Sequence, residues 1–168
     1  MRILCLGVVA LTLSACAADP MPDPYRGPAA TIVDSVQPGG ADSADFFYLS
    51  EVNGQAVENS LVDTASTNAG LTFDVKPVVT SRDVPTDPAT FTIVGRTHYG
   101  APVLEFVNPV YEVSGDIRFT PVPEKTYVVK GVLGENYSAI WIEEKATGAV
   151  VGRKIELHGS AELGIFEK

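Results

Sequence analysis

One polar stretch, Arg96-Thr97-His98-Tyr99, combines residue types that bind anions or transfer protons. On a β-strand Arg96 and His98 share a face, because successive side chains alternate. Arg82 lies at the end of the preceding strand, and we expect it to neighbour them across a hairpin. Such a cationic patch on an acidic chain suits a carboxylate or a glycan acid. The alternative is that Arg96 pairs with a nearby Asp or Glu and that His98 is merely exposed.

Motifs for catalysis or metal binding are not found in the sequence. It has no G-x-S-x-G, H-E-x-x-H or C-x-x-C, no calcium loop, and no S-x-x-K beyond the first fifteen residues. The two histidines, His98 and His158, are sixty residues apart, and His158 is expected at the surface. The sequence therefore predicts no catalytic residue, metal or cofactor. A hydrolase that uses His98 and a nearby acid remains the alternative.

Cys16 is the other residue with specific chemistry. The chain begins Met1-Arg2, and the thirteen uncharged residues that follow are too few for a membrane-spanning helix, which needs about 20. Leu13-Ser14-Ala15-Cys16 resembles the bacterial lipobox, which implies cleavage between Ala15 and Cys16 and a diacylglycerol on the thiol. Two or more acyl chains hold a protein stably on a membrane. The alternative is an ordinary signal peptide in which Cys16 is only a small residue.

These features divide the chain into a signal peptide (1–15), a lipidated cysteine with a proline-rich tether (16–28), and a single domain (29–168). The tether favours extended geometry and reaches roughly 35 Å. Ala17 and Ala18 stand where an aspartate would favour the inner membrane. We therefore expect an outer-membrane lipoprotein with its domain in the periplasm; the inner membrane and the cell surface remain alternatives.

The charge balance of the chain bears on the partners that it can bind. Loss of residues 1–15 removes only Arg2 among the charged residues, which leaves 11 basic and 21 acidic side chains, a net charge of −10. That sign argues against nucleic acid and against a basic lipid-binding patch. Cys5 lies in the signal segment, so the domain has no pair of thiols for a disulfide.

Alternation of apolar and polar residues dominates the rest of the chain and indicates strands with one face on a core. Asn53-Gly54 is a strong signal for a two-residue hairpin. The residues 59–70 are the least strand-like and are expected to form a helical turn or a loop on the sheet. The pattern predicts an antiparallel β-sandwich with eight or nine strands, at about 30–36, 46–52, 71–80, 89–98, 102–107, 111–120, 126–133, 138–144 and 149–157, and residues 162–166 as an added edge strand.

Large aromatic side chains are expected to build the core. Trp141, between Ile140 and Ile142, is interpreted as a core anchor, with a sugar-binding role as the alternative. Phe46, Phe47 and Tyr48 occupy both faces of one strand. We expect one face of that strand to be buried in the core and the other to be covered by the tether or a loop.

Four segments carry a resemblance to a known group: FFYLSEVNG, RTHYGAP, FTPVPEKTYVVKG and AIWIEEKATGAVVG. Together with the lipobox they resemble uncharacterised proteobacterial outer-membrane lipoproteins with an immunoglobulin-like β-sandwich domain. The resemblance implies a fold and a location, and it implies no catalytic residues.

The expected function is a lipid-anchored, non-catalytic binding or structural module. Its partners would be the membrane, through the anchor, and another envelope protein or the cell wall. A small-ligand carrier with an apolar cavity is the other alternative to the hydrolase.

Overall fold

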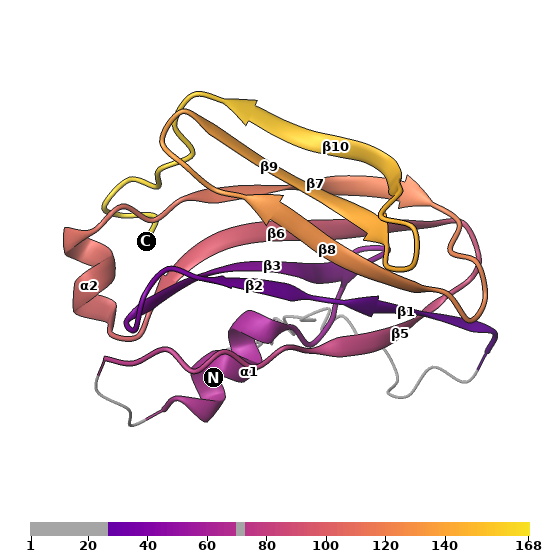
Figure 1. Cartoon of the computed structure of the whole chain (residues 1–168), viewed down its shortest axis with the longest axis horizontal. Helices are drawn as coiled ribbons and strands as arrows, with labels where there is room; N and C mark the ends of the chain where they lie inside the picture. Colours follow the sequence, from indigo (N-terminus) through magenta and orange to yellow (C-terminus); the bar gives the residue numbers. More distant parts are fainter. Residues whose placement is uncertain (1–26, 70–72) are drawn as a thin grey trace, which may run out of the picture.

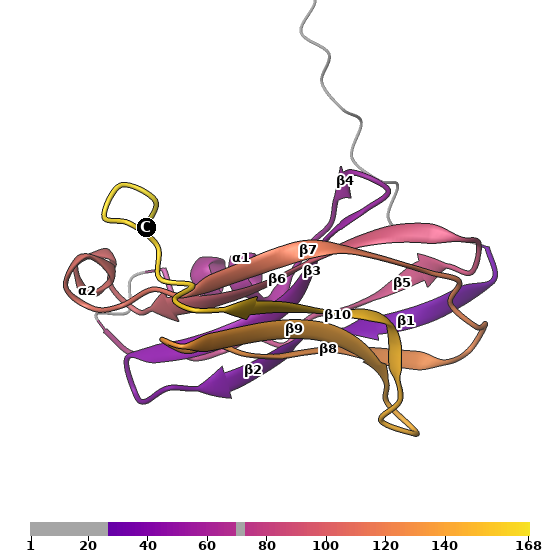
Figure 2. The ribbon, with the colours of Figure 1, turned by 90° about the horizontal axis from the view of Figure 1, so that it is seen from above.

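The structure is a computed structural model of the 168-residue chain and describes residues 27–69 and 73–168. Two β-sheets lie face to face and form a sandwich (Figures 1 and 2). The elements within these residues are β1 (Ala29–Val33), β2 (Ser35–Pro38), β3 (Ser43–Val52), β4 (Gln55–Ala56), α1 (Ser60–Thr67), β5 (Ser81–Pro85), β6 (Ala89–Tyr99), α2 (Pro102–Val107), β7 (Glu112–Phe119), β8 (Thr126–Val132), β9 (Tyr137–Glu144) and β10 (Val150–His158).

The strand order divides these elements between the sheets. One sheet has the order β10-β9-β8-β1-β5, and the other has β2-β3-β6-β7 with β4 paired to β3. Neighbouring strands are antiparallel except β1 and β8, which run parallel. The chain changes sheets at Asp34, between β1 and β2. The prediction of an all-β, largely antiparallel sandwich is confirmed, and the stretch 30–36 is two strands rather than one.

The expected Asn53-Gly54 turn joins β3 and β4. Asn53 has φ 51° and Gly54 has φ 78°, so both residues lie in the left-handed region. Two-residue hairpin loops of this kind match the twist of the strands and favour Asn-Gly. The Asn53 side chain also accepts a hydrogen bond from the backbone N–H of Thr90 at 2.9 Å, which ties the turn to β6.

Phe47 lies at the centre of the core between the sheets. A Cβ atom on Gly131 of β8 would stand 2.3 Å from the Phe47 ring, and one on Gly95 of β6 would stand 3.0 Å from it. The ring therefore occupies space that any larger residue at Gly131 would fill. Leu49, Phe91, Ile93, Ile140 and Ile142 belong to the same buried cluster. The space between the sheets is thus filled by the domain's own side chains.

A loop covers the opposite face of β3, as expected, and a helix covers it as well. Ala44, Phe46 and Tyr48 form a second buried cluster, against which Leu61 of α1 and Val75 pack. Asn59 caps the amino-terminal end of helix α1, and its side-chain oxygen accepts a hydrogen bond from Val62 N. The segment 59–70 therefore forms a helix as far as Thr67, and Gly70 lies outside the described residues.

Residues 102–107 were expected to form a strand, and that prediction is wrong. They form α2, with Pro102 in the first turn, where a fixed φ suits a helix and a missing N–H costs nothing. Asn108 ends the helix in extended geometry because Pro109 disfavours helix in the residue before it.

Two other predicted strands differ from the structure. Within the described part of 71–80, residues 73–80 have no regular secondary structure, and β5 begins only at Ser81. Thr64 and Ser60 of α1 bind the backbone of Val78 and Thr80, so this segment packs along a helix and not along a strand. Residues 162–166 add no edge strand, although Glu162 forms an isolated bridge with Tyr111.

Candidate functional site

Arg82 lies apart from the polar stretch it was expected to join. It lies in β5, which pairs with β1, whereas β6 pairs with β3 and β7 in the other sheet, so the predicted hairpin contact is wrong. Arg82 Nη2 donates to Asp34 Oδ2 at 2.7 Å, and the Asp34 side chain is fully buried. The Arg82 guanidinium is therefore bonded to a buried carboxylate inside the domain.

Asp34 is the centre of a buried network at the point where the chain changes sheets. Its carboxylate accepts hydrogen bonds from Leu49 N at 3.1 Å and from Ser60 N at 2.9 Å. Ser60 begins α1, so the negative charge lies at the positive end of that helix. Arg82 also donates to Leu49 O at 3.2 Å. One ion pair thus joins the junction of β1 and β2 to β3, α1 and β5.

Arg96 and His98 do share a face of β6, and both are bonded to carboxylates. Arg96 Nη1 donates to Glu112 Oε2 at 2.6 Å, and His98 Nδ1 lies 2.9 Å from Glu105 Oε1. The Tyr99 hydroxyl donates to Pro109 O at 3.1 Å. These contacts correspond to the alternative in which Arg96 pairs with an acid. Anion binding there would first have to displace an internal carboxylate.

The surroundings of this face are partly buried. The ring of His98 meets the buried Phe46 edge-on, with centroids 6.1 Å apart. Burial, together with the Glu112 carboxylate, raises the pKa of Tyr48 to about 12. Burial also raises the pKa of the Tyr99 hydroxyl, and the nearby Asp42 adds to the effect. Both phenols are therefore neutral hydrogen-bonding groups at physiological pH.

Trp141 is not the core anchor that we predicted. Ile140 and Ile142 are fully buried, but Trp141 points to the opposite face of β9 and is only half-buried. Its indole N–H donates to Glu143 Oε2 at 3.1 Å, and Lys154 Nζ lies 4.5 Å from the ring centroid. The cation covers part of the aromatic surface that a sugar would use. His158 is exposed, as expected, beside Tyr137.

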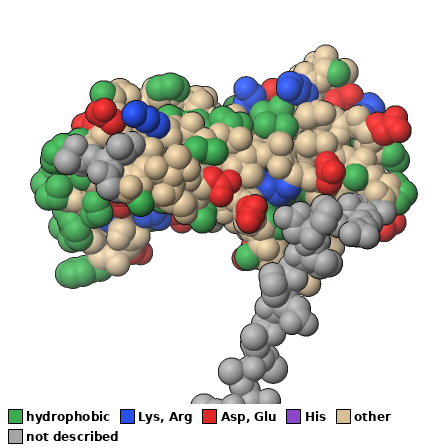
Figure 3. Space-filling model, turned by 90° about the horizontal axis from the view of Figure 1, so that it is seen from below, with side chains coloured by type: hydrophobic (Ala, Val, Ile, Leu, Met, Phe, Trp, Pro, Cys, Tyr) green, Lys and Arg blue, Asp and Glu red, His purple; other side chains and the backbone are tan. Residues whose placement is uncertain are grey.

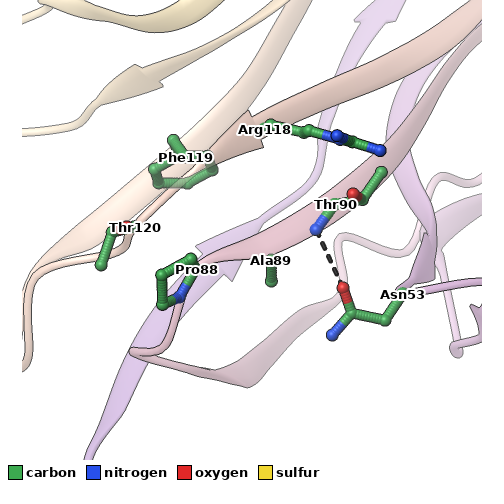
Figure 4. Close-up of a pocket in the computed structure, with 7 residues that line it drawn as sticks. All are labelled: Asn53, Pro88, Ala89, Thr90, Arg118, Phe119 and Thr120. Atoms are coloured by element: carbon green, nitrogen blue, oxygen red, sulfur yellow. Dashed lines mark hydrogen bonds between the residues drawn. The ribbon is translucent and has the colours of Figure 1, made fainter.

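A hollow of about 430 Å³ lies where the β3–β4 turn, the start of β6 and the end of β7 meet (Figure 4). Its lining combines hydrogen-bond donors with apolar surface and consists of Asn53, Pro88, Ala89, Thr90, Arg118, Phe119 and Thr120. Figure 4 shows Arg118 and Thr90 side by side, as their cross-strand pairing requires. Phe119 lies on the other side of β7 and packs against Phe91 at 4.7 Å between centroids.

Arg118 differs from Arg82 and Arg96 in its surroundings. It is exposed, and within residues 27–69 and 73–168 it makes no ion pair. The lining of the hollow contains no carboxylate. Asn53 uses its side-chain oxygen on Thr90, which leaves the amide NH₂ as a donor. The hollow therefore offers a guanidinium, an amide and two hydroxyls to an incoming group.

Sequence reasoning did not single out Arg118. In the sequence, Arg118 is marked only as one of the polar residues of the alternating stretch 111–120. Every solvent-facing residue of that strand has the same mark. The hollow forms because Asn53 is hydrogen-bonded to Thr90 across 37 residues, and Thr90 pairs with Arg118 across β6 and β7. Ala15 and Cys16 lie outside the described residues.

Three further observations bear on function. Within the described part of the chain, no three metal-ligating side chains come together, and none of the helices has the length and apolar character to cross a bilayer. Comparison with known proteins finds no matching family model, no matching curated protein and no matching solved structure.

Proposed function

We propose that this protein is a lipid-anchored, non-catalytic binding module of the bacterial envelope, and that it binds a carboxylate-bearing envelope component in the Arg118 hollow. The location rests on the Leu13-to-Cys16 sequence and the proline-rich tether. The outer membrane, with the domain in the periplasm, is the proposed site of anchoring. The immunoglobulin-like type of sandwich is part of the same proposal, supported by the sheet change between β1 and β2 and the parallel pairing of β1 with β8.

The observation that carries the binding role is the lining around Arg118, which offers several hydrogen-bond donors and contains no carboxylate. A guanidinium presents a planar fork of donors that matches a carboxylate. Pro88 supplies apolar surface for the atoms next to that carboxylate. The short peptides of the bacterial cell wall carry free carboxylates close to small apolar side chains. The cell wall therefore fits this hollow better than a purely apolar ligand does.

Two other functions receive less support. The His98–Glu105 contact supplies a base and an orienting acid for a hydrolase, but among the described hydrogen bonds no hydroxyl reaches the His98 ring. His98 is also not part of the Arg118 hollow. A carrier needs an apolar cavity, and side chains such as Phe47 and Phe91 fill the space between the sheets.

Cosedimentation with purified, insoluble cell-wall sacculi tests the proposal. We expect Arg118→Ala to weaken binding by about tenfold or more, since hydrogen bonds to charged groups contribute roughly 1.5–3 kcal/mol. Arg118→Lys retains the charge and is expected to retain part of the affinity.

Arg153→Ala is the matched control, because Arg153 is an exposed arginine of β10 without an ion pair among the described residues. Equal binding by the Arg118→Ala and Arg153→Ala chains would show that the hollow is not the binding site. Absence of binding by the unaltered chain would show that the cell wall is not the ligand.

A further inference from the structure

Two rows of polar side chains cross the outer face of the sheet at the Arg118 hollow. The first row lies on the β3–β4 turn, β6 and β7 and consists of Asn53, Thr90 and Arg118. The second row lies on β3, β6 and β7 and consists of Glu51, Thr92 and Asp116. Residues that pair across antiparallel strands have neighbouring side chains on one face of the sheet. Since Thr90 and Thr92 are two residues apart on β6, both rows lie on the same face.

The two rows differ in charge. The first row offers hydrogen-bond donors, among them the Arg118 guanidinium, whereas the second row has a carboxylate on either side of Thr92. Thr92 Oγ1 donates to Asp116 Oδ1 at 2.8 Å, and Asp116 Oδ2 has no hydrogen-bond partner among the described residues. In the same part of the chain, neither Asp116 nor Glu51 makes an ion pair. The positive charge of Arg118 therefore lies beside two carboxylates on the outer face of the sheet.

The Arg118 side chain extends along β7 toward the second row. Figure 4 shows it pointing away from Phe119 and Thr120, and therefore toward the residues that precede it, among them Asp116. Cα atoms two residues apart on a strand are separated by about 6.6 Å, which leaves room for a small group bonded to each side chain at about 2.8 Å. An exposed Arg–Asp pair contributes little stability by itself. A ligand that bonds to both groups thus displaces no strong internal contact.

The charges of the second row discriminate between ligands that carry a carboxylate. A bare carboxylate bonded to Arg118 would also face Asp116 and Glu51, and like charges brought together across an interface are unfavourable. A ligand with an ammonium beside its carboxylate reverses the sign of that interaction. The ammonium donates to the carboxylates of the second row, and such charge-assisted hydrogen bonds are the strong ones. The two rows are therefore complementary to a zwitterion.

We infer that the site binds a free α-amino acid end, in which an ammonium and a carboxylate are attached to one carbon. Arg118 bonds to the carboxylate, and Asp116 together with Glu51 bonds to the ammonium. The remainder of the ligand lies over Thr90, in the hollow lined by Pro88. This inference rests on the proposed function, because it uses the same site and names the chemical class of the group that the site binds.

Three small probes test the two halves of the site separately. Alanine carries both charges, N-acetylalanine keeps only the carboxylate, and alaninamide keeps only the ammonium. Their dissociation constants are measured on the purified full chain from the NMR chemical-shift changes of the Thr90 and Thr92 amides. We expect alanine to bind about tenfold more tightly than either of the other two, since it alone bonds to both rows. Asp116→Asn should bring the dissociation constants of alanine and N-acetylalanine together.

A control is needed because acidic side chains cover much of the molecule. The chain has 21 acidic and 12 basic residues, and Figure 3 shows acidic side chains spread over the face drawn there. Any ammonium is attracted weakly to such a surface. Asp83→Asn is the matched variant, because Asp83 is an exposed aspartate of the other sheet that also accepts a threonine hydroxyl, from Thr31 at 3.1 Å. It should leave the preference for alanine unchanged.

Several results would overturn the inference. Equal binding of alanine and N-acetylalanine would do so and would leave the proposed carboxylate site in place, and a preference for alanine that survives Asp116→Asn would also do so. The same holds for absence of binding by all three probes. Tighter binding of phosphoethanolamine, the headgroup of a zwitterionic lipid, would overturn the assignment to an amino acid. Failure of the proposed ligand alone is distinct: the unaltered chain then does not sediment with sacculi, yet alanine still binds more tightly than N-acetylalanine.

Discussion

At the scale of single residues, Asp45 is partly buried, which disfavours its charged form. Burial raises its pKa above the usual value, and a hydrogen bond from Thr97 Oγ1 at 2.7 Å opposes that effect only in part. A raised folded pKa means that the folded chain holds the proton more tightly than the unfolded chain does. The stability of the fold therefore falls as the pH rises from the unfolded pKa through the folded pKa.

Asp45→Asn removes this charge and keeps an acceptor for Thr97. We expect the variant to melt at a higher temperature than the unaltered chain at pH 7, with the difference vanishing below about pH 3, where the carboxyl is protonated in both states. Thermal melts followed by circular dichroism across that pH range check it. Asp116→Asn is the control, since Asp116 also accepts a threonine hydroxyl but is exposed. A destabilised Asp45→Asn chain at pH 7 would contradict the argument.

Arg118 and Arg82 show why residue roles were only partly predictable. Both are arginines in or near strands, and local sequence cannot tell a guanidinium that meets a buried carboxylate from one that faces a hollow. Asp34 lies 48 residues from Arg82, and only the fold brings them together. The shared face of Arg96 and His98, by contrast, depends on strand alternation alone and was predicted.

At the scale of elements, the Asp34–Arg82 pair holds together parts of both sheets and the cap of α1. Removing one partner leaves the other as an uncompensated buried charge, which costs about 3–5 kcal/mol. We expect Asp34→Ala to lower the free energy of unfolding by that amount, measured by urea denaturation.

The double variant Asp34→Ala/Arg82→Met separates charge from packing. It should recover a substantial part of the loss, because no buried charge remains unpaired. A double variant that loses as much as the two single variants combined would show that the carboxylate and the guanidinium act independently.

Elements with a local signal were predicted well, and elements defined by distant contacts were not. The alternation in 89–98 and 126–133 corresponds to β6 and β8, and Asn53-Gly54 forms the expected turn. Residues 102–107 contain mostly apolar side chains without a clear period, and their helix was missed. Trp141 was assigned to the core because its neighbours are apolar, yet alternation places it on the opposite face from Ile140 and Ile142.

At the scale of the whole molecule, the proposed anchor at Cys16 predicts where the chain resides. We expect Cys16→Ser to abolish labelling by radioactive palmitate and to shift the chain from the membrane fraction to the soluble fraction, since serine has no thiol to acylate. Cys5→Ser, in the segment proposed to be removed, should change neither readout.

The same Cys16→Ser chain should unfold at the same temperature as the unaltered protein, because the sandwich described here has its own filled core. Membrane fractionation that is unchanged by Cys16→Ser would contradict the lipid anchor.

The position of β1 has a mechanical consequence. It is the first strand of the domain, yet it lies inside its sheet, bonded to β8 on one side and to β5 on the other. A pulling force that enters at Ala29 and leaves through the opposite end runs along the strand axes. The hydrogen bonds of β1 to β8 and to β5 must then shear at the same time, because a force along the strands does not open them one after another. The pairing of β1 on both sides therefore favours resistance of the domain to a force applied between its two ends.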